Sequence, residues 1–268
     1  MSESPAYVIR GGIPGRERLR ILARVMAPTT NSLLDRLGDL AGARCLDAGC
    51  GGGDVTRELA RRAGPNGHAA GIDLDETKLA LCREEHAALG NIEFRGARIG
   101  EDDIGGPYDV VYSRFLLTHL PDPGSAVRQF HSVLPPGGRI ALEDIDFSAY
   151  VAHPFSAAHR RYAELYSKVV RLRGADPDIG PRLPSLLLQH GFTDVSVSVF
   201  QPMGLSGEVK LMPPITVESI SDAVVAAGLA SADEMASLAQ ELYADAANPA
   251  TLCGNPRVVQ AWGRKPGG

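Results

Sequence analysis

The sequence has little of what marks a membrane-embedded or nucleic-acid-binding protein. Its apolar runs fall short of the roughly 18 residues that a membrane span needs. The chain starts without the basic and apolar regions of a secretory signal. Its 27 Lys and Arg residues are outnumbered by 32 Asp and Glu residues, for a net charge of −5. That balance argues against a broad basic surface for nucleic acid. We therefore expect a cytoplasmic protein with no membrane partner and no nucleic-acid partner.

Cysteine is also scarce. The four residues Cys45, Cys50, Cys82 and Cys253 form no CxxC pair and no pattern of metal-ligand spacing. We expect reduced thiols and no metal site. The 268 residues are enough for a full-size hydrophobic core without disulfide bonds, in one or two domains.

Short apolar runs alternate with amphipathic stretches from residue 44 to residue 144. The runs predict strands at 44–48, 68–73, 91–96, 108–113 and 139–143. The amphipathic stretches predict helices at 54–63, 76–89 and 122–134. Strands that alternate with helices imply a parallel α/β sheet with helices on both faces. Right-handed crossovers then bring the loops that bind ligands to one edge of the sheet.

The flanking segments are less regular. We expect helices at 15–37, 155–173, 181–190 and 216–227, and another from Ser231, where Glu234 has capping-box spacing. Apolar alternation predicts edge strands at 194–201 and 257–263. The helices without a place in a simple sheet are interpreted as a cap over the ligand edge.

A glycine-rich loop joins the first predicted strand to the helix after it. The segment reads CLDAGCGGG over residues 45–53, and its glycines allow a sharp turn and a close approach to a ligand. Asp54 stands where a nicotinamide-binding loop has its third glycine, and no Gly-Lys-Ser/Thr follows as in a P-loop. Both of those nucleotide-binding classes are therefore disfavoured.

Acidic residues end the first two strands. A carboxylate at Asp47 would repel a pyrophosphate but would suit a ligand with positive charge, such as the ammonium and sulfonium of S-adenosylmethionine. Asp73 ends the second strand, 20 residues beyond Gly53. An acid at similar spacing accepts the ribose hydroxyls of dinucleotides.

These motifs resemble those of class I S-adenosylmethionine-dependent methyltransferases, most closely the small-molecule branch with the ubiquinone/menaquinone-type and natural-product enzymes. The matching segments are LDAGCGGGDVT (46–56), GIDLDE (71–76), YDVVYSRFLLTHLPDP (108–123) and LPPGGRIALEDIDF (134–147). The resemblance implies a Rossmann-like, seven-stranded, mostly parallel sheet with an antiparallel last strand, helices on both faces and a helical cap. It makes 202–256 an insertion between the last two strands.

The expected organisation has five parts. Residues 1–42 would be an N-terminal helical lid, where the start of YVIRGG (7–12) with Arg18 and Leu19 resembles the family's lid segment. Residues 43–147 would be the cofactor-binding core, and 148–201 would hold cap helices that return to the sheet. Residues 202–256 would be the cap insertion, and 257–268 the last strand and tail.

The resemblance assigns cofactor-binding residues by position. It implies that Asp47, Gly49 and Gly51 hold the methionine part and that Asp73 holds the ribose. Further candidates for cofactor contacts are Cys50, Leu74, Arg98, Ile99 and Arg114.

One of these positions departs from the family pattern. Arg98 stands where the family usually has an acid that accepts the adenine amino group, and arginine cannot accept a hydrogen bond. It could stack on the adenine, or a neighbouring backbone carbonyl could serve as the acceptor. Ile99 is a candidate for covering one face of the adenine.

Candidates for catalysis follow the fourth and fifth strands. His119 is the best-placed general base, and a structural histidine under the cofactor loop is the equal alternative. Asp144 is a second catalytic candidate. Candidates for acceptor binding are Glu143, Asp146, His153, Tyr150 and Tyr166, although an acid there could serve as a cap and an aromatic stripe could be core packing.

The sequence therefore predicts methyl transfer from S-adenosyl-L-methionine to an O, N or C atom of a small organic acceptor, in secondary or cofactor metabolism, with S-adenosyl-L-homocysteine as product. A homodimer is included in the hypothesis. Two alternatives stay open: a methyltransferase acting on RNA or protein, and a cyclase-like relative that binds the cofactor without methylating.

Overall fold

The strands of the main sheet lie where the alternating pattern predicts them. The computed structural model describes residues 12–267. The main-sheet strands are β1 (Arg44–Ala48), β2 (His68–Asp73), β3 (Ile92–Gly96), β4 (Val110–Arg114), β5 (Arg139–Asp146), β6 (Thr193–Phe200) and β9 (Arg257–Arg264). Two short strands, β7 (Met203–Gly204) and β8 (Cys253–Gly254), pair separately.

The helices alternate with these strands and then gather after them. They are α1 (Gly12–Arg36), α2 (Asp54–Ala63), α3 (Glu76–Glu85), α4 (Pro123–Val133), α5 (Ala157–Arg171), α6 (Leu183–Gln189), α7 (Met212–Ala226) and α8 (Ala232–Ala247). The helix expected from Ser231 begins as its capping pattern predicts, because the Ser231 hydroxyl accepts the Glu234 backbone N–H at 3.1 Å.

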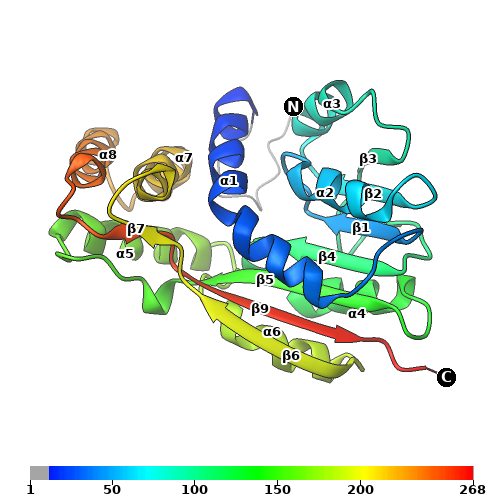
Figure 1. Ribbon diagram of the computed structural model, residues 1–268. Coiled ribbons are helices and arrows are strands. Elements are labelled where there is room, and N and C mark those ends of the chain that lie inside the picture. The colour runs from blue at the N-terminus through cyan, green and yellow to red at the C-terminus, as the bar shows by residue number, and fades with distance from the viewer. Residues whose placement is uncertain (1–11, 268) are drawn as a thin grey trace.

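The main sheet has the strand order β3-β2-β1-β4-β5-β9-β6. Neighbouring strands are parallel from β3 through β5, and β9 is antiparallel to both β5 and β6 (Figure 1). The predicted fold class, a mostly parallel seven-stranded sheet with an antiparallel last strand, is confirmed. The segment between β6 and β9 holds α7 and α8.

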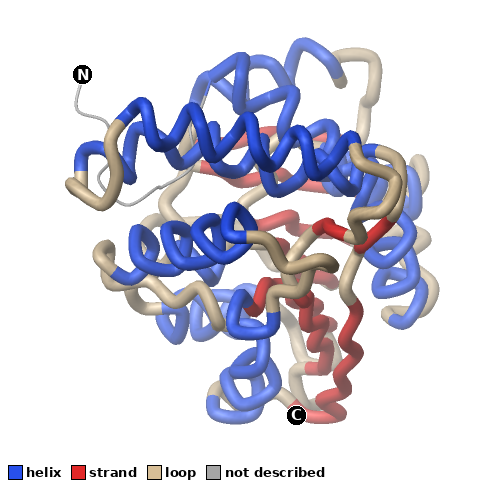
Figure 2. The backbone as a smooth tube through the Cα atoms, turned by 90° about the vertical axis from the view of Figure 1, so that its left-hand side faces the viewer, coloured by secondary structure: helices blue, strands red, loops and turns tan. Residues whose placement is uncertain are grey.

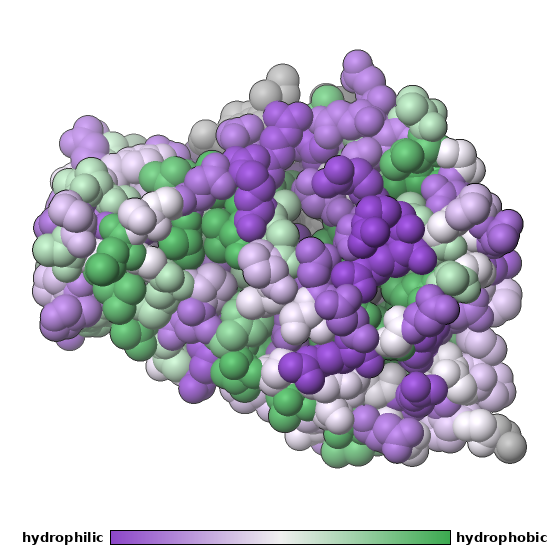
Figure 3. All heavy atoms as spheres, viewed as in Figure 1, coloured by the Kyte–Doolittle hydropathy of each residue, from purple (hydrophilic) through white to green (hydrophobic). Residues whose placement is uncertain are grey.

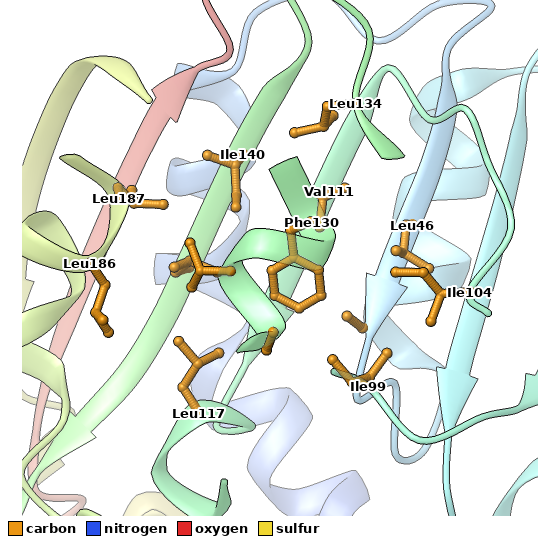
Figure 4. Packing of buried hydrophobic residues seen from close by; sticks show 14 of the residues in the cluster. Leu46, Ile99, Ile104, Val111, Leu117, Phe130, Leu134, Ile140, Leu186 and Leu187 are labelled. Carbon is orange, nitrogen blue, oxygen red and sulfur yellow. The ribbon is translucent and has the colours of Figure 1, made fainter. Parts of the chain in front are cut away.

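Helices cover both faces of this sheet. On one face α4 and α6 enclose an apolar core in which the Phe130 ring lies among Val111, Ile140 and Leu117 (Figure 4). On the other face α2 and the second half of α1 pack on a second core that includes Leu34, with no exposed surface. The two cores hold the carboxyl ends of β1, β2, β4 and β5 at a common edge.

The remaining helices stand over that edge. The first half of α1 packs with α5, α7 and α8 through a third apolar cluster, which includes Leu22, Leu165, Ile220 and Leu238. Seen from this end, helices lie in front of the strands (Figure 2). Apolar side chains also reach the surface on the side of α7 and α8 (Figure 3). These four helices form the cap predicted from the irregular flanks.

Two expected boundaries were wrong in ways that matter. The helix predicted at 76–89 ends at Glu85, where His86 leaves helical geometry, so Leu89 is not on its apolar face and is exposed. The strand predicted at 139–143 continues to Asp146, because its last three residues pair with Arg257, Val258 and Val259 of β9. The continuation makes Asp144 and Asp146 strand residues rather than loop residues.

Within residues 12–267, no helix combines the length and the apolar character that a membrane crossing requires.

Candidate active site

A cavity lies at the carboxyl ends of the parallel strands, under the cap. It has about 900 Å³ of space free of protein atoms, its open mouth included. One end, the glycine-loop end, is formed by Asp47, Gly49, Gly51 and Asp73. The other, the aromatic end, is formed by Phe147, Tyr162 and Tyr166. Further lining residues include Arg18, Leu19, Leu22, Cys50, Asp54, Tyr112, Arg114, Phe115, His119, Ile145, Met212, Thr216, Asn255 and Pro256.

The glycine loop turns where only glycine fits. Gly49 has φ 75°, and a Cβ there would lie 3.1 Å from the Leu116 side chain. Gly51 has φ 51° and faces the Leu19 side chain of α1, which would be 3.5 Å from a Cβ. Larger residues would be strained by the backbone at both positions, and at Gly49 they would also be crowded by Leu116. The loop is fixed to β2, since the N–H groups of Gly49 and Cys50 donate to the Ile72 carbonyl at 2.8 and 2.9 Å.

Asp47 lies at the base of this loop and is only 2% exposed. Its carboxylate accepts the Thr56 hydroxyl at 2.7 Å. Burial raises the pKa of Asp47 to about 6, against the lowering effects of the Thr56 hydrogen bond and of the Arg114 charge. A cationic ligand in the cavity would favour the ionised form of Asp47 and would gain from it in turn.

Asp73 ends β2 beside the loop. One carboxylate oxygen accepts the Gly51 N–H at 2.9 Å, and the other accepts the Asp75 N–H at 3.0 Å. Each oxygen keeps a further lone pair. The carboxylate is therefore held in place and can still accept hydroxyl groups from a ligand.

Arg114 belongs to a buried polar network behind the cavity. It donates to the Thr30 hydroxyl at 3.0 Å, and that hydroxyl donates to Glu143 at 3.0 Å. Gln260 of β9 donates to the same carboxylate at 3.0 Å. Glu143 was predicted to bind the acceptor, but its carboxylate faces this network and not the cavity. Burial raises the pKa of Glu143, and the Arg114 charge opposes the shift.

Asp144 and Asp146 also lie outside the cavity, on the opposite face of β5 from Glu143, as strand alternation requires. Asp144 accepts the backbone N–H of Thr118 at 3.1 Å and of Ile145 at 2.8 Å. Asp146 caps the turn at Ser148 and forms an ion pair with Arg257. The catalytic role expected for Asp144 and the acceptor role expected for Asp146 have no geometric support.

His119 lines the cavity in the turn after β4 and is 6% exposed. Burial lowers the pKa of His119 to about 3, and the nearby charges of Arg18, Lys78 and Arg173 add to the effect. The imidazole is therefore neutral at pH 7. A neutral imidazole can accept a proton, though one with so low a pKa is a weak base.

The aromatic residues divide between the cavity and its wall. Tyr166 lines the cavity and stacks on Phe147, with ring centroids 4.0 Å apart. Tyr150 lies behind them, where its hydroxyl meets Nδ1 of His159 at 2.7 Å. His153 is exposed and pairs through its backbone with Leu252, away from the lining residues. Tyr166 is thus the predicted acceptor residue that reaches the cavity.

The expected adenine contacts, Arg98 and Ile99, and the further cofactor candidate Leu74 stand apart from the enclosed part of the cavity. Leu74 follows Asp73 and is 46% exposed. The Arg98 side chain lies at the surface, 3.3 Å from Glu101, and Ile99 packs into the core beside α4. None of the three is among the described residues that line the cavity.

Sequence reasoning missed several lining residues. Ile145 and Phe147 share a face of β5 and its continuation, and period-2 alternation from residue 143 onward could have revealed them. Phe115 lines the cavity with φ 54°, an uncommon backbone conformation for a residue with a side chain. Met212 and Asn255 reach the cavity from the segment between β6 and β9, and no local signal marks them.

Among the described residues, no group of three or more His, Cys, Asp or Glu side chains is arranged to hold a metal ion.

Comparison of the sequence with known proteins identifies a family. Residues 39–181 match the family model described as a methyltransferase domain. Over 120 residues the chain is 36% identical to a ubiquinone biosynthesis O-methyltransferase from Acinetobacter baumannii, an overlap of 43% of this chain and 49% of that protein. The corresponding enzyme from Pseudomonas aeruginosa is 33% identical over 123 residues, covering 44% and 51%. The chain spans about half the length of these curated relatives.

Solved structures share the architecture. Haemonchus contortus phosphoethanolamine N-methyltransferase 2, in complex with S-adenosyl-L-methionine, has a TM-score of 0.56 at 20% identity and covers 98% of this chain and 55% of its own. Geranyl diphosphate C-methyltransferase from Streptomyces coelicolor A3(2) has a TM-score of 0.56 at 14% identity, covering 93% and 83%. At such identities the likeness shows the fold alone.

The sheet order and the glycine loop define a Rossmann-like α/β protein of the kind seen in methyltransferases. The family match covers more than half of the chain, so the chain belongs to the methyltransferase-domain family.

Proposed function

We propose that this protein transfers a methyl group from S-adenosyl-L-methionine to a small organic acceptor. The observation that carries the proposal is the meeting of Asp47, Asp73 and the positive-φ glycine loop in one cavity. The buried carboxylate of Asp47 and the partly buried one of Asp73 suit a ligand with an ammonium, a sulfonium and a ribose diol, and they disfavour a diphosphate.

The residues present fit this cofactor. Asp47 would face its positive charges, and Asp73 would accept its ribose hydroxyls. Gly49, Cys50 and Gly51 leave room for the methionine portion, and Arg114 supplies a positive charge at the same end. When bound, the cofactor supplies an electrophilic methyl carbon, so the protein mainly has to align the acceptor and exclude water.

The aromatic end would bind the acceptor under the cap. Phe147, Tyr162 and Tyr166 offer an apolar wall, and His119 is the histidine that lines the same cavity. We keep His119 as the candidate that takes a proton from the acceptor and withdraw Asp144, whose carboxylate is held by backbone N–H groups of the next turn.

The relatives narrow the acceptor. Because the curated relatives are O-methyltransferases of ubiquinone biosynthesis, we favour a hydroxyl oxygen as the methylated atom and cofactor metabolism over natural-product biosynthesis. The net charge of −5 disfavours RNA as the acceptor. A cytoplasmic location and a homodimer remain part of the proposal.

We also propose a division of labour along the chain. Residues 43–147 would hold the cofactor. Residues 1–42, 148–201 and 202–256 would form the lid and cap, and 257–268 would close the sheet. In the part of the chain that the structure describes, α1 is joined to the cofactor-binding part by Arg16. This residue donates to the Gly52 carbonyl and forms an ion pair with Glu85 of α3.

Two measurements test the proposal. Calorimetry should detect S-adenosyl-L-homocysteine binding, with no heat from NAD or ATP. Incubation of the protein with S-adenosyl-L-methionine and a panel of phenols, amines and active-methylene compounds should then release S-adenosyl-L-homocysteine with at least one of them. Tight binding of NAD without binding of S-adenosyl-L-homocysteine would contradict the cofactor assignment. Binding of S-adenosyl-L-homocysteine without turnover of any acceptor would favour the cyclase-like alternative.

A further inference from the structure

Arg18 of α1 lies where two hollows of the molecule meet. It lines the candidate active site and also a groove between α1, α7 and α8. Its Nε atom is buried and has no hydrogen-bond acceptor among the described residues. Burying a guanidinium N–H group without an acceptor costs free energy, so we expect a bound ligand to supply an acceptor for Arg18.

The neighbouring arginines of the same helix are all engaged. Arg16 and Arg20 pair with Glu85 of α3, and Arg24 pairs with Glu208. Spacing by four residues puts these three on one face of the helix. Arg18 is two residues, or about 200°, from Arg16 and so points to the opposite side. Within residues 12–267, no carboxylate lies within ion-pair distance of it.

The two arginines that line the described cavity act on different surroundings. The charge of Arg114 acts on Asp47 and Glu143, where it opposes the rise in pKa that burial causes. The charge of Arg18 instead acts on His119, where it adds to the lowering of the pKa by burial, and on Tyr162, where it opposes the rise in pKa that burial causes. The glycine-loop end thus has its own balanced cation, and the excess positive charge lies toward the aromatic end.

The aromatic end supplies a flat surface beside this charge. Phe147 and Tyr166 are stacked with an interplanar angle of 14° and a centroid distance of 4.0 Å, and Tyr162 meets Phe147 edge-on at 5.6 Å. Such an arrangement accommodates a planar ring by stacking or edge contact. A planar apolar body and one anionic group are the two features that this end of the cavity complements.

We propose that Arg18 binds the carboxylate of an aromatic methyl acceptor and so selects acidic over neutral acceptors. The inference rests on the proposed function. The guanidinium fork matches a carboxylate with two parallel N–H donors, and the acceptor ring lies along the Phe147 and Tyr166 side of the cavity. Arg18 is thereby a specificity-determining residue that contacts the substrate.

The placement has a consequence for His119. Burial is the main cause of the low His119 pKa, and a carboxylate bound at Arg18 would offset one of the three charges that add to it, the others being Lys78 and Arg173. The bound acceptor therefore raises the basicity of the imidazole beside it.

The test compares acids with their neutral esters. The probes are 3,4-dihydroxybenzoate, caffeate and salicylate, each with its methyl ester, titrated by calorimetry into protein saturated with S-adenosyl-L-homocysteine. The wild-type protein should bind at least one acid tenfold or more tightly than its ester. Arg18→Gln should lose that preference while binding S-adenosyl-L-homocysteine within twofold of wild type.

Two variants control the comparison. Arg20→Gln removes a cation from the opposite face of the same helix and should keep the acid preference. Arg18→Lys keeps the charge without the fork and should restore part of the preference. No acid preference in wild type, or a preference retained in Arg18→Gln, would overturn the role proposed for Arg18 but leave the proposed methyltransferase function untouched. Loss of S-adenosyl-L-homocysteine binding in Arg18→Gln would reassign Arg18 to the cofactor. Absence of that binding in wild type would overturn the proposed function as well.

Discussion

The two ends of the cavity are built in different ways. The glycine-loop end comes from Asp47, Gly49 and Gly51, within five consecutive residues, and from Asp73 on the neighbouring strand. The aromatic end takes Phe147 from the segment after β5 and Tyr162 and Tyr166 from α5. Residues of α1, of α7 and of the turn before β9 complete its surroundings.

This difference in construction fits two different kinds of binding site. The glycine-loop end is rich in carboxylates and is fixed by backbone hydrogen bonds, which suits one constant, charged ligand. The aromatic end is fixed by side-chain packing between separate segments, so it can change shape when any one segment changes. Such a difference between the two ends would suit a family whose members share one cofactor but act on different acceptors.

The largest effect is expected at the glycine-loop end. Asp47→Asn keeps the hydrogen bond with Thr56 but removes a buried charge that would face the cofactor. We expect the affinity for S-adenosyl-L-homocysteine to fall about 10²-fold, as for loss of one partner in a buried charge pair, with little change in the melting temperature. Calorimetry measures the first and scanning calorimetry the second.

The control is Asp233→Asn, which removes an exposed charge at the start of α8. It should leave the affinity unchanged. Wild-type affinity in Asp47→Asn would remove the electrostatic basis of the cofactor assignment.

The sequence reveals the glycine-loop end of the cavity much better than the aromatic end. The glycine loop and its two flanking acids follow from a local pattern of period and turn residues, and the parallel sheet follows from the alternation of strands and helices. The structure has all three as predicted. The carboxylates of β5 were misplaced because the strand was ended at Glu143. Once the strand continues, Glu143 faces α1, and Asp144 and Asp146 face the other side.

The aromatic end could not be assembled from sequence because its parts are far apart in the chain. Arg18, Met212 and Asn255 belong to segments that tertiary packing alone brings together. Helical spacing identified Tyr162 and Tyr166 on one face of α5, but spacing does not distinguish a core face from a cavity wall.

The next effect is expected in the buried polar network behind the cavity. Thr30→Val removes a hydroxyl that accepts from Arg114 and donates to Glu143, in a side chain of the same shape. Two buried charged groups then lose a partner, so the free energy of unfolding should fall by about 1–3 kcal/mol. Urea unfolding at pH 7 measures it.

Thr29→Val is the matched control, since the Thr29 hydroxyl donates to a carbonyl of its own helix, that of Met26. Its free energy of unfolding should stay near that of wild type. Equal stabilities of the two variants would mean that the Arg114 and Glu143 charges do not depend on Thr30.

A smaller effect is expected at the aromatic end. Phe147→Leu keeps an apolar side chain but removes the ring that stacks on Tyr166 and meets Tyr162. We expect at least about 0.5–1.5 kcal/mol less stability, which is what aromatic pairs contribute beyond the apolar area that they bury, and unchanged affinity for S-adenosyl-L-homocysteine. Phe155→Leu is the control, because Phe155 is largely exposed. A large loss of cofactor affinity in Phe147→Leu would show that the two ends are not independent.

The last effect concerns the protonation of His119. Because burial and the charges of Arg18, Lys78 and Arg173 lower the His119 pKa from 6.5 to about 3, the folded protein keeps this ring neutral while the unfolded chain protonates it below about pH 6.5. The group therefore favours folding above pH 6.5, and that contribution is lost as the pH falls toward 3. In ¹³C-labelled protein, the His119 ring signal, assigned by its loss in His119→Asn, should not shift between pH 8 and pH 5. His119→Asn should also lose less stability than wild type over that interval. A midpoint near 6.5 would place the imidazole in contact with solvent and would remove the reason for expecting an acidic acceptor to tune it.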